Sequence, residues 1–182
     1  MYQIIKQILR TGIKTETPPG PDEALRIEAQ RIQKDILRHV GRALAIRCVD
    51  AGSCNGCELE IHALNNAYYN IEGLGIHFVA SPRHADMLLV TGPVSRHMET
   101  ALKRTYDATP HPKLVVALGD CGCDGGIFSP TDSGGDKCAS YASCGKVSNV
   151  IPVDVAIPGC PPTPITILQG ILTAVSGEAQ TS

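Results

Sequence analysis

Cysteine is the residue type whose number and spacing in this sequence could support chemistry. Cys54 and Cys57 are separated by two residues within "DAGSCNGCELEIHAL" (50–64), between an apolar run and a helical pattern. Cys121 and Cys160 lie much further along the chain, which gives the spacing C-x2-C-x63-C-x38-C. Four convergent thiolates can hold a tetrahedral zinc ion or an iron–sulfur cluster. The pattern therefore suggests a metal centre, provided that the fold brings these positions together.

The cellular compartment decides what the eight cysteines of the chain can do. The opening residues, "MYQIIKQILRTG", lack the continuous apolar run and the small-residue cleavage site of a secretory signal. No stretch approaches the roughly 20 apolar residues of a membrane span. We therefore expect a cytosolic compartment, where thiols stay reduced or bind metal. A disulfide framework is the weaker interpretation for 182 residues with cysteines spread from Cys48 to Cys160.

Composition excludes several other classes of function. The net charge of −2 gives no reason to expect nucleic acid as a partner. No G-x-S-x-G elbow follows an apolar strand, which argues against a serine hydrolase, and the phosphate-binding P-loop pattern is absent. The 18 glycines and 13 prolines fit many short connections between buried elements.

Apolar runs alternate with helical patterns from Arg42 onward, which predicts a parallel sheet covered by helices on both faces, an α/β fold. Strands are expected within 42–50, 75–81, 85–92, 112–120 and 149–159, and helices over 57–71, 95–109 and 163–177. The stretch 121–148 is rich in glycine and serine and is expected to be a long loop, a type of segment that is usually functional or mobile.

The four spaced cysteines all follow predicted strands. Cys54 and Cys57 come after the first strand, Cys121 after the fourth and Cys160 after the fifth. In an open α/β sheet, ligands bind at the carboxyl ends of the strands, so these loops should converge. A structural zinc site usually takes two local pairs, whereas this chain has one clear pair, which favours a cluster held by a folded scaffold. Spacing alone nevertheless leaves zinc, an iron–sulfur cluster and separate buried thiols open.

The N-terminal part is expected to be distinct, with a division into residues 1–41 and an α/β domain over 42–177. Residues 1–14 predict a short amphipathic segment that contacts a membrane surface or a partner, although a frayed basic terminus is the alternative. Its apolar residues are Ile4, Ile5, Ile8 and Leu9, and its basic residues are Lys6, Arg10 and Lys14. Prolines within 15–23 interrupt the chain, and an apolar stripe over 21–40 predicts a docking helix.

Four motifs in order resemble one protein family: "SCNGCELEI", "SPRHADMLLVTGPVSRHM", "ALGDCGCDGGIFSP" and "IPVDVAIPGCPPTP". The family is the small subunit of group 4 membrane-bound [NiFe] hydrogenases, including formate hydrogenlyase, with the related 20 kDa (B) subunit of respiratory complex I. The resemblance covers about residues 42–175. It implies a flavodoxin-like fold and one 4Fe-4S cluster next to the catalytic large subunit. The ligands that it implies are Cys54, Cys57, Cys121 and Cys160.

Within this resemblance, the first cysteine pair favours the hydrogenase branch. Complex I-type members carry adjacent cysteines here, whereas this chain has Cys-Asn-Gly-Cys. The resemblance implies a non-catalytic redox subunit without nickel, peripheral on the cytoplasmic face of the membrane. Its implied partners are the nickel–iron large subunit, a ferredoxin-like iron–sulfur subunit and membrane subunits. The alternatives are a complex I-type subunit that passes electrons to quinone and, in another class, a zinc-stabilised interaction module.

The remaining cysteines have no role that the resemblance assigns. Cys123 forms "CGC" with Cys121, and Cys138 and Cys144 lie in the long loop. We expect them to be free thiols, with a second metal site as the alternative. Cys48 lies inside a predicted strand and is expected to be a core residue.

A few polar residues near the cysteines are also candidates for function. Glu60 could couple proton and electron transfer or could simply favour the start of a helix. Arg83 and His84 follow a strand, where the histidine could titrate near neutral pH or make a surface hydrogen bond. Asp120 is expected to cap a turn. Two prolines should shape the loop after the last cysteine, namely Pro161 and Pro162.

Overall fold

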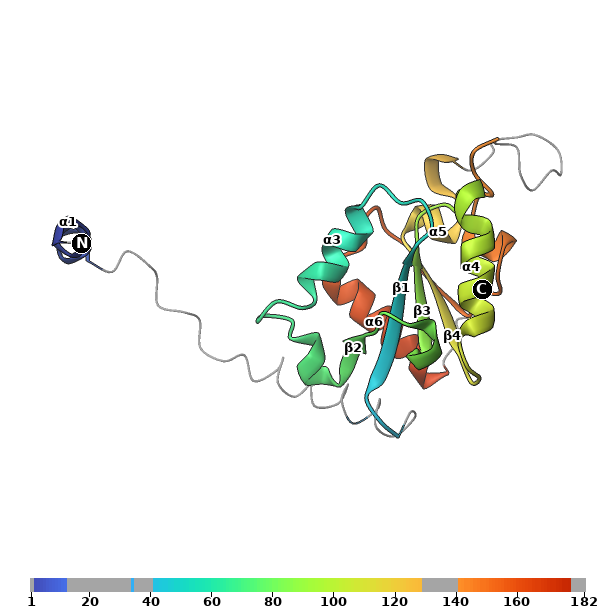
Figure 1. Ribbon diagram of the computed structural model, residues 1–182, viewed down its shortest axis with the longest axis horizontal. Coiled ribbons are helices and arrows are strands. Elements are labelled where there is room, and N and C mark those ends of the chain that lie inside the picture. The colour runs from blue at the N-terminus through green and yellow to red at the C-terminus, as the bar shows by residue number, and fades with distance from the viewer. Residues whose placement is uncertain (1, 13–33, 35–40, 129–140, 178–182) are drawn as a thin grey trace.

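Five strands form one parallel sheet with the order β2–β1–β3–β4–β5 (Figure 1). The computed structural model describes residues 2–12, 34, 41–128 and 141–177. This strand order is that of flavodoxin-like proteins, so the predicted α/β class is confirmed. The strands are β1 (Leu44–Asp50), β2 (Ile76–Phe78), β3 (Met87–Thr91), β4 (Leu114–Leu118) and β5 (Val155–Ile157).

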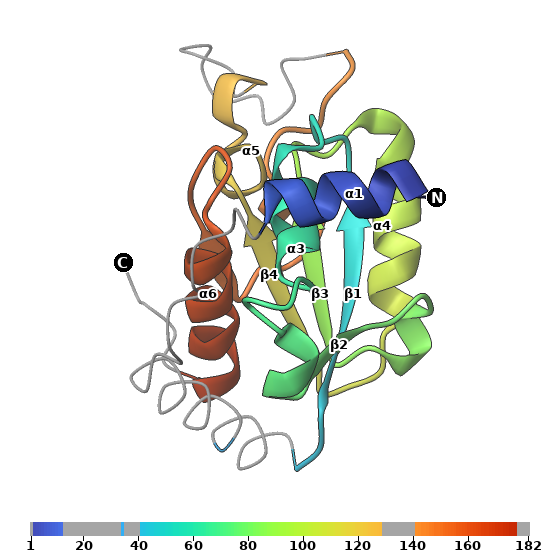
Figure 2. The ribbon, with the colours of Figure 1, turned by 90° about the vertical axis from the view of Figure 1, so that its left-hand side faces the viewer.

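The central strand, β3, shows that the sheet is covered on both faces. All five of its residues are buried, as expected for a strand that is covered on both faces. It pairs with β1 through Ile46↔Met87 and with β4 through Met87↔Leu114, both in parallel. All strands therefore end at the same edge, which is the upper edge in Figure 2.

Helices cover the sheet from two sides. On one face lie α3 (Gly56–Ala63) and α6 (Pro164–Ser176), and on the other lies α4 (Arg96–Ala108) (Figures 1 and 2). Two separate groups of buried side chains fill the spaces between these layers. The first includes Leu44, Ile46, Ile61, Ile167 and Ile171, and the second includes Leu88, Val90, Leu102, Val115 and Val147.

The structure corrects the predicted extent of one helix. The pattern over 57–71 predicts a continuous helix, but α3 ends at Ala63. The side chain of Asn66 accepts hydrogen bonds from the backbone N–H groups of Tyr68 and Tyr69, each at 2.9 Å. Such local bonds compete with helical ones, and Asn70 then adopts a left-handed conformation. Apolar spacing alone did not reveal this competition.

The other two helices of the domain match their predicted ranges closely. Ser95 caps α4 by accepting a hydrogen bond from the N–H of Met98, and Thr163 caps α6 in the same way through Thr166. The stretch predicted as a loop over 121–148 contains the last three residues of a short helix, α5 (Asp120–Cys123). Single 3-10 turns complete the domain at Ile71–Leu74, Pro82–His84, Gly126–Phe128 and Val147–Asn149.

The predicted N-terminal extension is present as helix α1 (Tyr2–Thr11), none of whose side chains is buried. The docking helix predicted over 21–40 falls, apart from residue 34, outside the described residues. In the part of the chain that the structure describes, no helix is long and apolar enough to cross a membrane.

Candidate functional site

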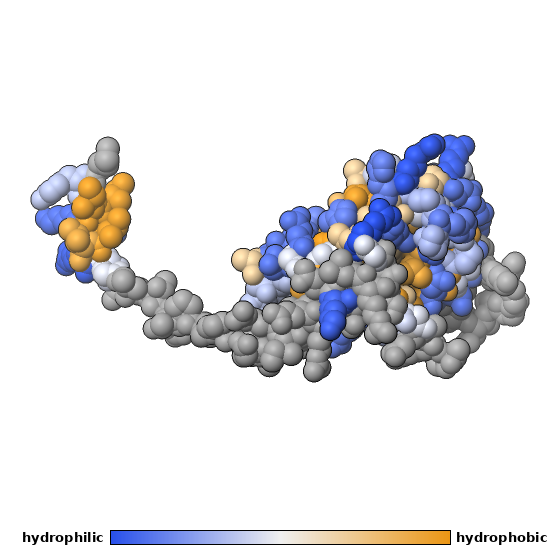
Figure 3. Space-filling view, turned by 90° about the horizontal axis from the view of Figure 1, so that it is seen from below, coloured by the Kyte–Doolittle hydropathy of each residue, from blue (hydrophilic) through white to orange (hydrophobic). Residues whose placement is uncertain are grey.

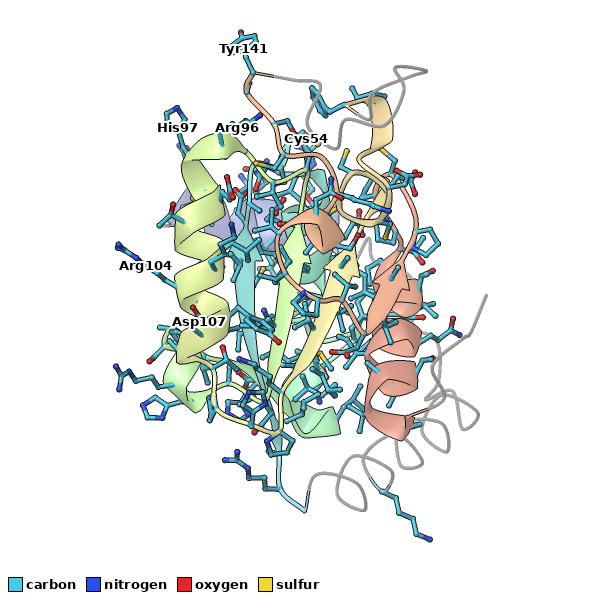
Figure 4. The ribbon with its side chains drawn as sticks, turned by 90° about the vertical axis from the view of Figure 1, so that its right-hand side faces the viewer. Cys54, Arg96, His97, Arg104, Asp107 and Tyr141 are labelled. Carbon is cyan, nitrogen blue, oxygen red and sulfur yellow. The ribbon has the colours of Figure 1, made fainter. Side chains whose placement is uncertain are left out.

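Three loops at the carboxyl edge of the sheet carry the four predicted ligand residues. Cys54 lies in the loop after β1, and Cys57 is the second residue of α3. Cys121 lies in α5, directly after β4, and Cys160 lies between β5 and α6. Figure 4 shows Cys54 at this end of the sheet. Cys54 and Cys160 are exposed, whereas the other two thiols are partly buried.

The loop between β1 and α3 is fixed by an aspartate at the end of its strand. One carboxylate oxygen of Asp50 accepts hydrogen bonds from the N–H groups of Gly52 and Ser53, each at 2.8 Å. Asn55 then takes a left-handed conformation, with φ of 71°, immediately before the helix. This turn places Cys54 outside the helix and Cys57 in its first turn.

The carboxylate of Glu58 ties the same loop to the neighbouring strand. One oxygen accepts a hydrogen bond from the hydroxyl of Ser53 at 2.7 Å, and the other accepts one from the hydroxyl of Thr91. Thr91 is fully buried at the end of β3 and also donates to the carbonyl of Val49. The cysteine-bearing loop is therefore held against the sheet by a buried hydroxyl.

The loops after β4 and β5 are joined to each other through Asp120. Its carboxylate accepts a hydrogen bond from the N–H of Gly159 at 2.7 Å, and its own N–H donates to the carbonyl of Gly159 at 2.9 Å. Asp120 was expected to cap a turn, but its carboxylate bonds to the loop after β5 instead. It fixes the loop of Cys121 relative to the loop of Cys160.

Glycines line the space beside the thiols, where a larger residue would intrude. A Cβ atom added to Gly119 would lie 2.6 Å from the Cys57 sulfur, and one added to Gly126 would lie 2.9 Å from the Cys121 sulfur. Gly119 also has a φ of 80°, which disfavours other residues. The backbone can therefore approach the sulfurs closely, as expected around a bound inorganic group.

The electrostatics of the site indicate that the four thiols influence one another. The pKa of Cys57 is raised to about 12, first by burial, then by the charge of Glu58 and then by the other three cysteines. The pKa of Cys121 is also raised, mainly by burial and then by Cys160 and Cys54. Uncompensated thiolates are thus disfavoured here, and a cation would relieve their repulsion.

A single metal ion and an iron–sulfur cluster differ in how far apart they hold the cysteine sulfurs. Within 2–12, 34, 41–128 and 141–177, no group of three or more His, Cys, Asp or Glu side chains is close enough to hold one metal ion. In a 4Fe-4S cluster each cysteine binds a different iron, so the sulfurs stand further apart than around one zinc ion. Four cysteines on three loops, opposite glycine backbone, fit that larger group.

The described cysteines outside this set pack as core residues. Cys48 contacts the core beneath α3 and α6, and Cys123 contacts the core beneath α4. The thiol of Cys123 also donates a hydrogen bond to the carbonyl of Ala117 at 3.5 Å. The two cysteines of "CGC" therefore lie in different environments, Cys121 at the candidate site and Cys123 against the core. Cys144 is buried and lies 3.5 Å from a carboxylate oxygen of Glu99. Cys138 falls outside the described residues.

Sequence reasoning selected Glu60, but the carboxylate in the loop network is that of Glu58. Ser53 and Glu58 are five residues apart, not the three of a capping box, so their spacing gave no recognised signal, and the partner on β3 could not be inferred. Arg83 and His84 lie in the exposed turn after β2. Of the two prolines after Cys160, Pro161 is exposed and Pro162 is buried.

A flavodoxin-like sheet with cysteine-bearing loops at its carboxyl edge defines a class of α/β proteins built to hold a group at that edge. The chain belongs to the family of the NADH ubiquinone oxidoreductase 20 kDa subunit, whose sequence pattern matches residues 54–174. This family consists of subunits of oxidoreductase complexes. The match begins at Cys54 and includes all four predicted ligands.

Curated relatives place the chain near hydrogenase subunits. The probable membrane-bound hydrogenase subunit mbhJ of Pyrococcus furiosus is 40% identical over 156 residues, covering 84% of this chain and 88% of the relative. Formate hydrogenlyase subunit 7 of Escherichia coli is 40% identical over 79% of this chain and 53% of the relative. An NADH-quinone oxidoreductase subunit of Desulfovibrio desulfuricans is 41% identical over 72% of this chain and 66% of the relative.

A solved structure supports the same assignment. A chain of the membrane-bound sulfane sulfur reductase, an archaeal respiratory membrane complex, matches with a TM-score of 0.61 and 30% identity. The match covers 80% of this chain and 76% of that chain. The chain is therefore a complex I 20 kDa-like subunit related to subunits of membrane-bound complexes.

Proposed function

We propose that this chain is an electron-transfer subunit that carries one 4Fe-4S cluster, held by Cys54, Cys57, Cys121 and Cys160. The observation that carries the proposal is the position of these cysteines on three segments that follow β1, β4 and β5 at one edge of the sheet, with glycine backbone close to the sulfurs of Cys57 and Cys121. When bound, such a cluster supplies one-electron transfer. The chain itself would be a redox subunit rather than the catalytic one.

The protein's own groups would bind and orient the cluster. Asp50 and Glu58 fix the first loop, and Asp120 fixes the other two relative to each other. Gly119 and Gly126 leave room beside the sulfurs. A rigid site of this kind lets the potential be set by the surrounding charges and hydrogen bonds.

The surface around the cysteines suits a protein partner. Several large apolar side chains near the proposed ligands are exposed, and electron exchange needs a partner close to the cluster. We infer that this surface contacts the nickel–iron large subunit of a membrane-bound hydrogenase, with a ferredoxin-like subunit and membrane subunits completing the assembly. The exposed residues are Leu59 (61%), Ile127 (90%), Phe128 (52%) and Ile165 (51%).

A hydrogenase is favoured over a quinone-reducing complex by the Cys-Asn-Gly-Cys spacing. A complex I-type subunit that passes electrons to quinone remains the second candidate, supported by the similarity to the NADH-quinone oxidoreductase relative. The partner separates the two. A large subunit that co-purifies with this chain and contains nickel supports the hydrogenase, and a nickel-free partner with quinone reductase activity supports the alternative.

The cluster is tested by metal and sulfide analysis of the complex purified without oxygen. We expect four iron atoms and four sulfides per chain at this site, and each substitution of a ligand by alanine should remove the corresponding EPR signal. Cys48→Ala and Cys123→Ala are matched controls, because these cysteines pack in the two cores instead. One zinc and no iron at this site would instead support the zinc-stabilised interaction module.

A further inference from the structure

Helix α1 separates its residues completely into two faces. Since each residue of a helix turns by about 100°, Tyr2, Ile5 and Leu9 align along one side, with Ile4 and Ile8 beside them. All the polar residues occupy the opposite side: Gln3, Lys6, Gln7, Arg10 and Thr11. Figure 3 shows the apolar side as one continuous patch. This division is that of a helix that lies at a boundary between an apolar and a polar medium.

The apolar face of α1 is not covered by the domain. None of its residues is buried. The exposed fractions are 78% for Tyr2, 62% for Ile4, 53% for Ile5, 64% for Ile8 and 79% for Leu9. A monomer rarely leaves five adjacent large apolar side chains in water, so something else must cover them.

The charge of this helix indicates what covers it. The polar face carries Lys6 and Arg10 and no acidic residue, and the first acidic residue of the chain is Glu16. The chain as a whole has a net charge of −2, so this helix, with two basic and no acidic residues, is more positive than the rest of the chain. This combination is suited to anionic lipid headgroups, which attract basic residues beside an inserted apolar face.

The placement of individual residues also suits a lipid surface. Lys6 follows Tyr2 by one helical turn, so a basic group and a phenol lie together at the border of the apolar face. Lysine, arginine and tyrosine commonly occupy such borders, because their apolar parts sit in the acyl region while their polar ends reach water. With ten residues, α1 is too short to span the bilayer and would lie in its plane.

We propose that α1 is a membrane-surface anchor, whose Tyr2, Ile4, Ile5, Ile8 and Leu9 face inserts into an anionic lipid surface. The anchor does not depend on the cluster. It adds a direct contact with lipid to the attachment that protein partners provide. A single myristoyl chain binds membranes with only about 10⁴ M⁻¹, and so short a helix is expected to bind no more tightly. Its contribution therefore adds to the attachment of an assembly and is not sufficient alone.

The absence of tryptophan from the chain allows a direct test. Tyr2→Trp in the full-length chain puts the only indole on the apolar face of α1. With vesicles of 30% phosphatidylglycerol in phosphatidylcholine, we expect a blue shift of emission and quenching by brominated acyl chains. Gln7→Trp, on the polar face of the same helix, is the matched control and should remain more accessible to iodide.

Two further variants of the Tyr2→Trp chain separate the apolar and the electrostatic contributions. Ile5→Gln with Leu9→Gln should abolish the blue shift on every vesicle. Lys6→Gln with Arg10→Gln should weaken binding about 30-fold, since each basic residue near an anionic surface contributes about fivefold. Vesicle binding of the Tyr2→Trp chain without these further substitutions should also weaken with added salt and on vesicles of pure phosphatidylcholine.

The competing occupant is a groove on a protein partner, and a second measurement distinguishes it. A photo-crosslinking residue at Leu9 in the assembled, membrane-attached complex should form adducts with lipid. Adducts with a protein subunit instead, or an unchanged Tyr2→Trp emission on anionic vesicles, would overturn the proposal. The iron and sulfide content of the complex should be the same with and without these substitutions, so the result does not depend on the proposed cluster.

Discussion

The hydroxyl of Ser53 donates a hydrogen bond to the carboxylate of Glu58 at 2.7 Å, across the turn that carries Cys54. The second oxygen of the same carboxylate accepts from the buried hydroxyl of Thr91 at the end of β3. One side chain thus links the cysteine loop, the first turn of α3 and the central strand. We infer that Glu58 keeps the first two proposed ligands in position.

Replacing Glu58 by alanine should loosen this loop. The substitution leaves the buried Thr91 hydroxyl with the carbonyl of Val49 at 3.3 Å as its acceptor, and losing the hydrogen bond to the charged carboxylate costs about 1.5–3 kcal/mol. We expect faster loss of iron from the purified complex on exposure to a chelator, measured by absorbance and iron content. An unchanged rate of iron loss would mean that the loop is fixed by other contacts.

The conservative variant Glu58→Gln separates position from charge. Glutamine can still accept one of the two hydrogen bonds, so iron content should be retained. Because a negative charge beside the site is removed, the midpoint potential measured by EPR titration should become more positive. Glu60→Gln is the control on the same helix, and its potential should change less. Equal shifts for the two variants would contradict a specific role for Glu58.

Gly119 gives a second test of the site, with Gly75 as the control. Gly119→Ala places a Cβ atom 2.6 Å from the Cys57 sulfur and strains the backbone, because φ of 80° with ψ of 157° is a conformation that is essentially confined to glycine. Gly75→Ala also introduces strain at a positive φ of 81°, but Gly75 is in the ordinary left-handed region, with ψ of 26°, and has nothing within 4 Å of an added Cβ atom. Gly75→Ala should lose about 1–2 kcal/mol of stability and Gly119→Ala about 1–3 kcal/mol, and only Gly119→Ala should lose iron. Equal iron contents in the two variants would show that the close approach at Gly119 is not needed.

The sheet and the place of the cysteines could be predicted because both depend on local patterns. The apolar runs that became β3 and β4 are continuous, and that of β1 is interrupted within the strand only by Arg47. Parallel strands end at one edge, so residues that follow them should lie close together. The end of α3 could not be predicted in this way. It depends on Asn66 bonding to the backbone of Tyr68 and Tyr69, a competition that apolar spacing does not reveal.

The contacts that join the loops could not be predicted either, since they link residues far apart in the sequence. The carboxylate of Glu58 meets Thr91, and that of Asp120 meets the backbone of Gly159. Such pairs follow from strand order and register, which the sequence does not specify locally. The same limit explains why Glu60 was selected and Glu58 was not.

The raised pKa of Cys48 predicts that the stability of the metal-free chain depends on pH. Burial is the main cause that raises its pKa from 9.0 to about 11. Between these values the unfolded chain loses the thiol proton while the folded chain keeps it, so stability falls as pH rises. One such group contributes about 1.4 kcal/mol per pH unit.

Cys48→Val is the variant that isolates this contribution, since valine suits a strand and does not titrate. Urea unfolding at pH 8 to 11 should show that the stability of the variant falls less steeply with rising pH, by about 1 kcal/mol per pH unit near pH 10. Parallel curves for the two proteins would show that Cys48 does not retain its proton in the folded chain.

The last prediction concerns the apolar surface around the proposed cluster. Ile165 is 51% exposed and lies in the first turn of α6, five residues after Cys160. If this surface contacts the catalytic large subunit, Ile165→Glu buries a charge in the interface and should lower the amount of chain retained on a tagged large subunit at least tenfold. Tyr68→Glu is the control, because Tyr68 is 72% exposed but lies beyond the other end of α3. Equal retention of the two variants would place the large subunit elsewhere on the chain.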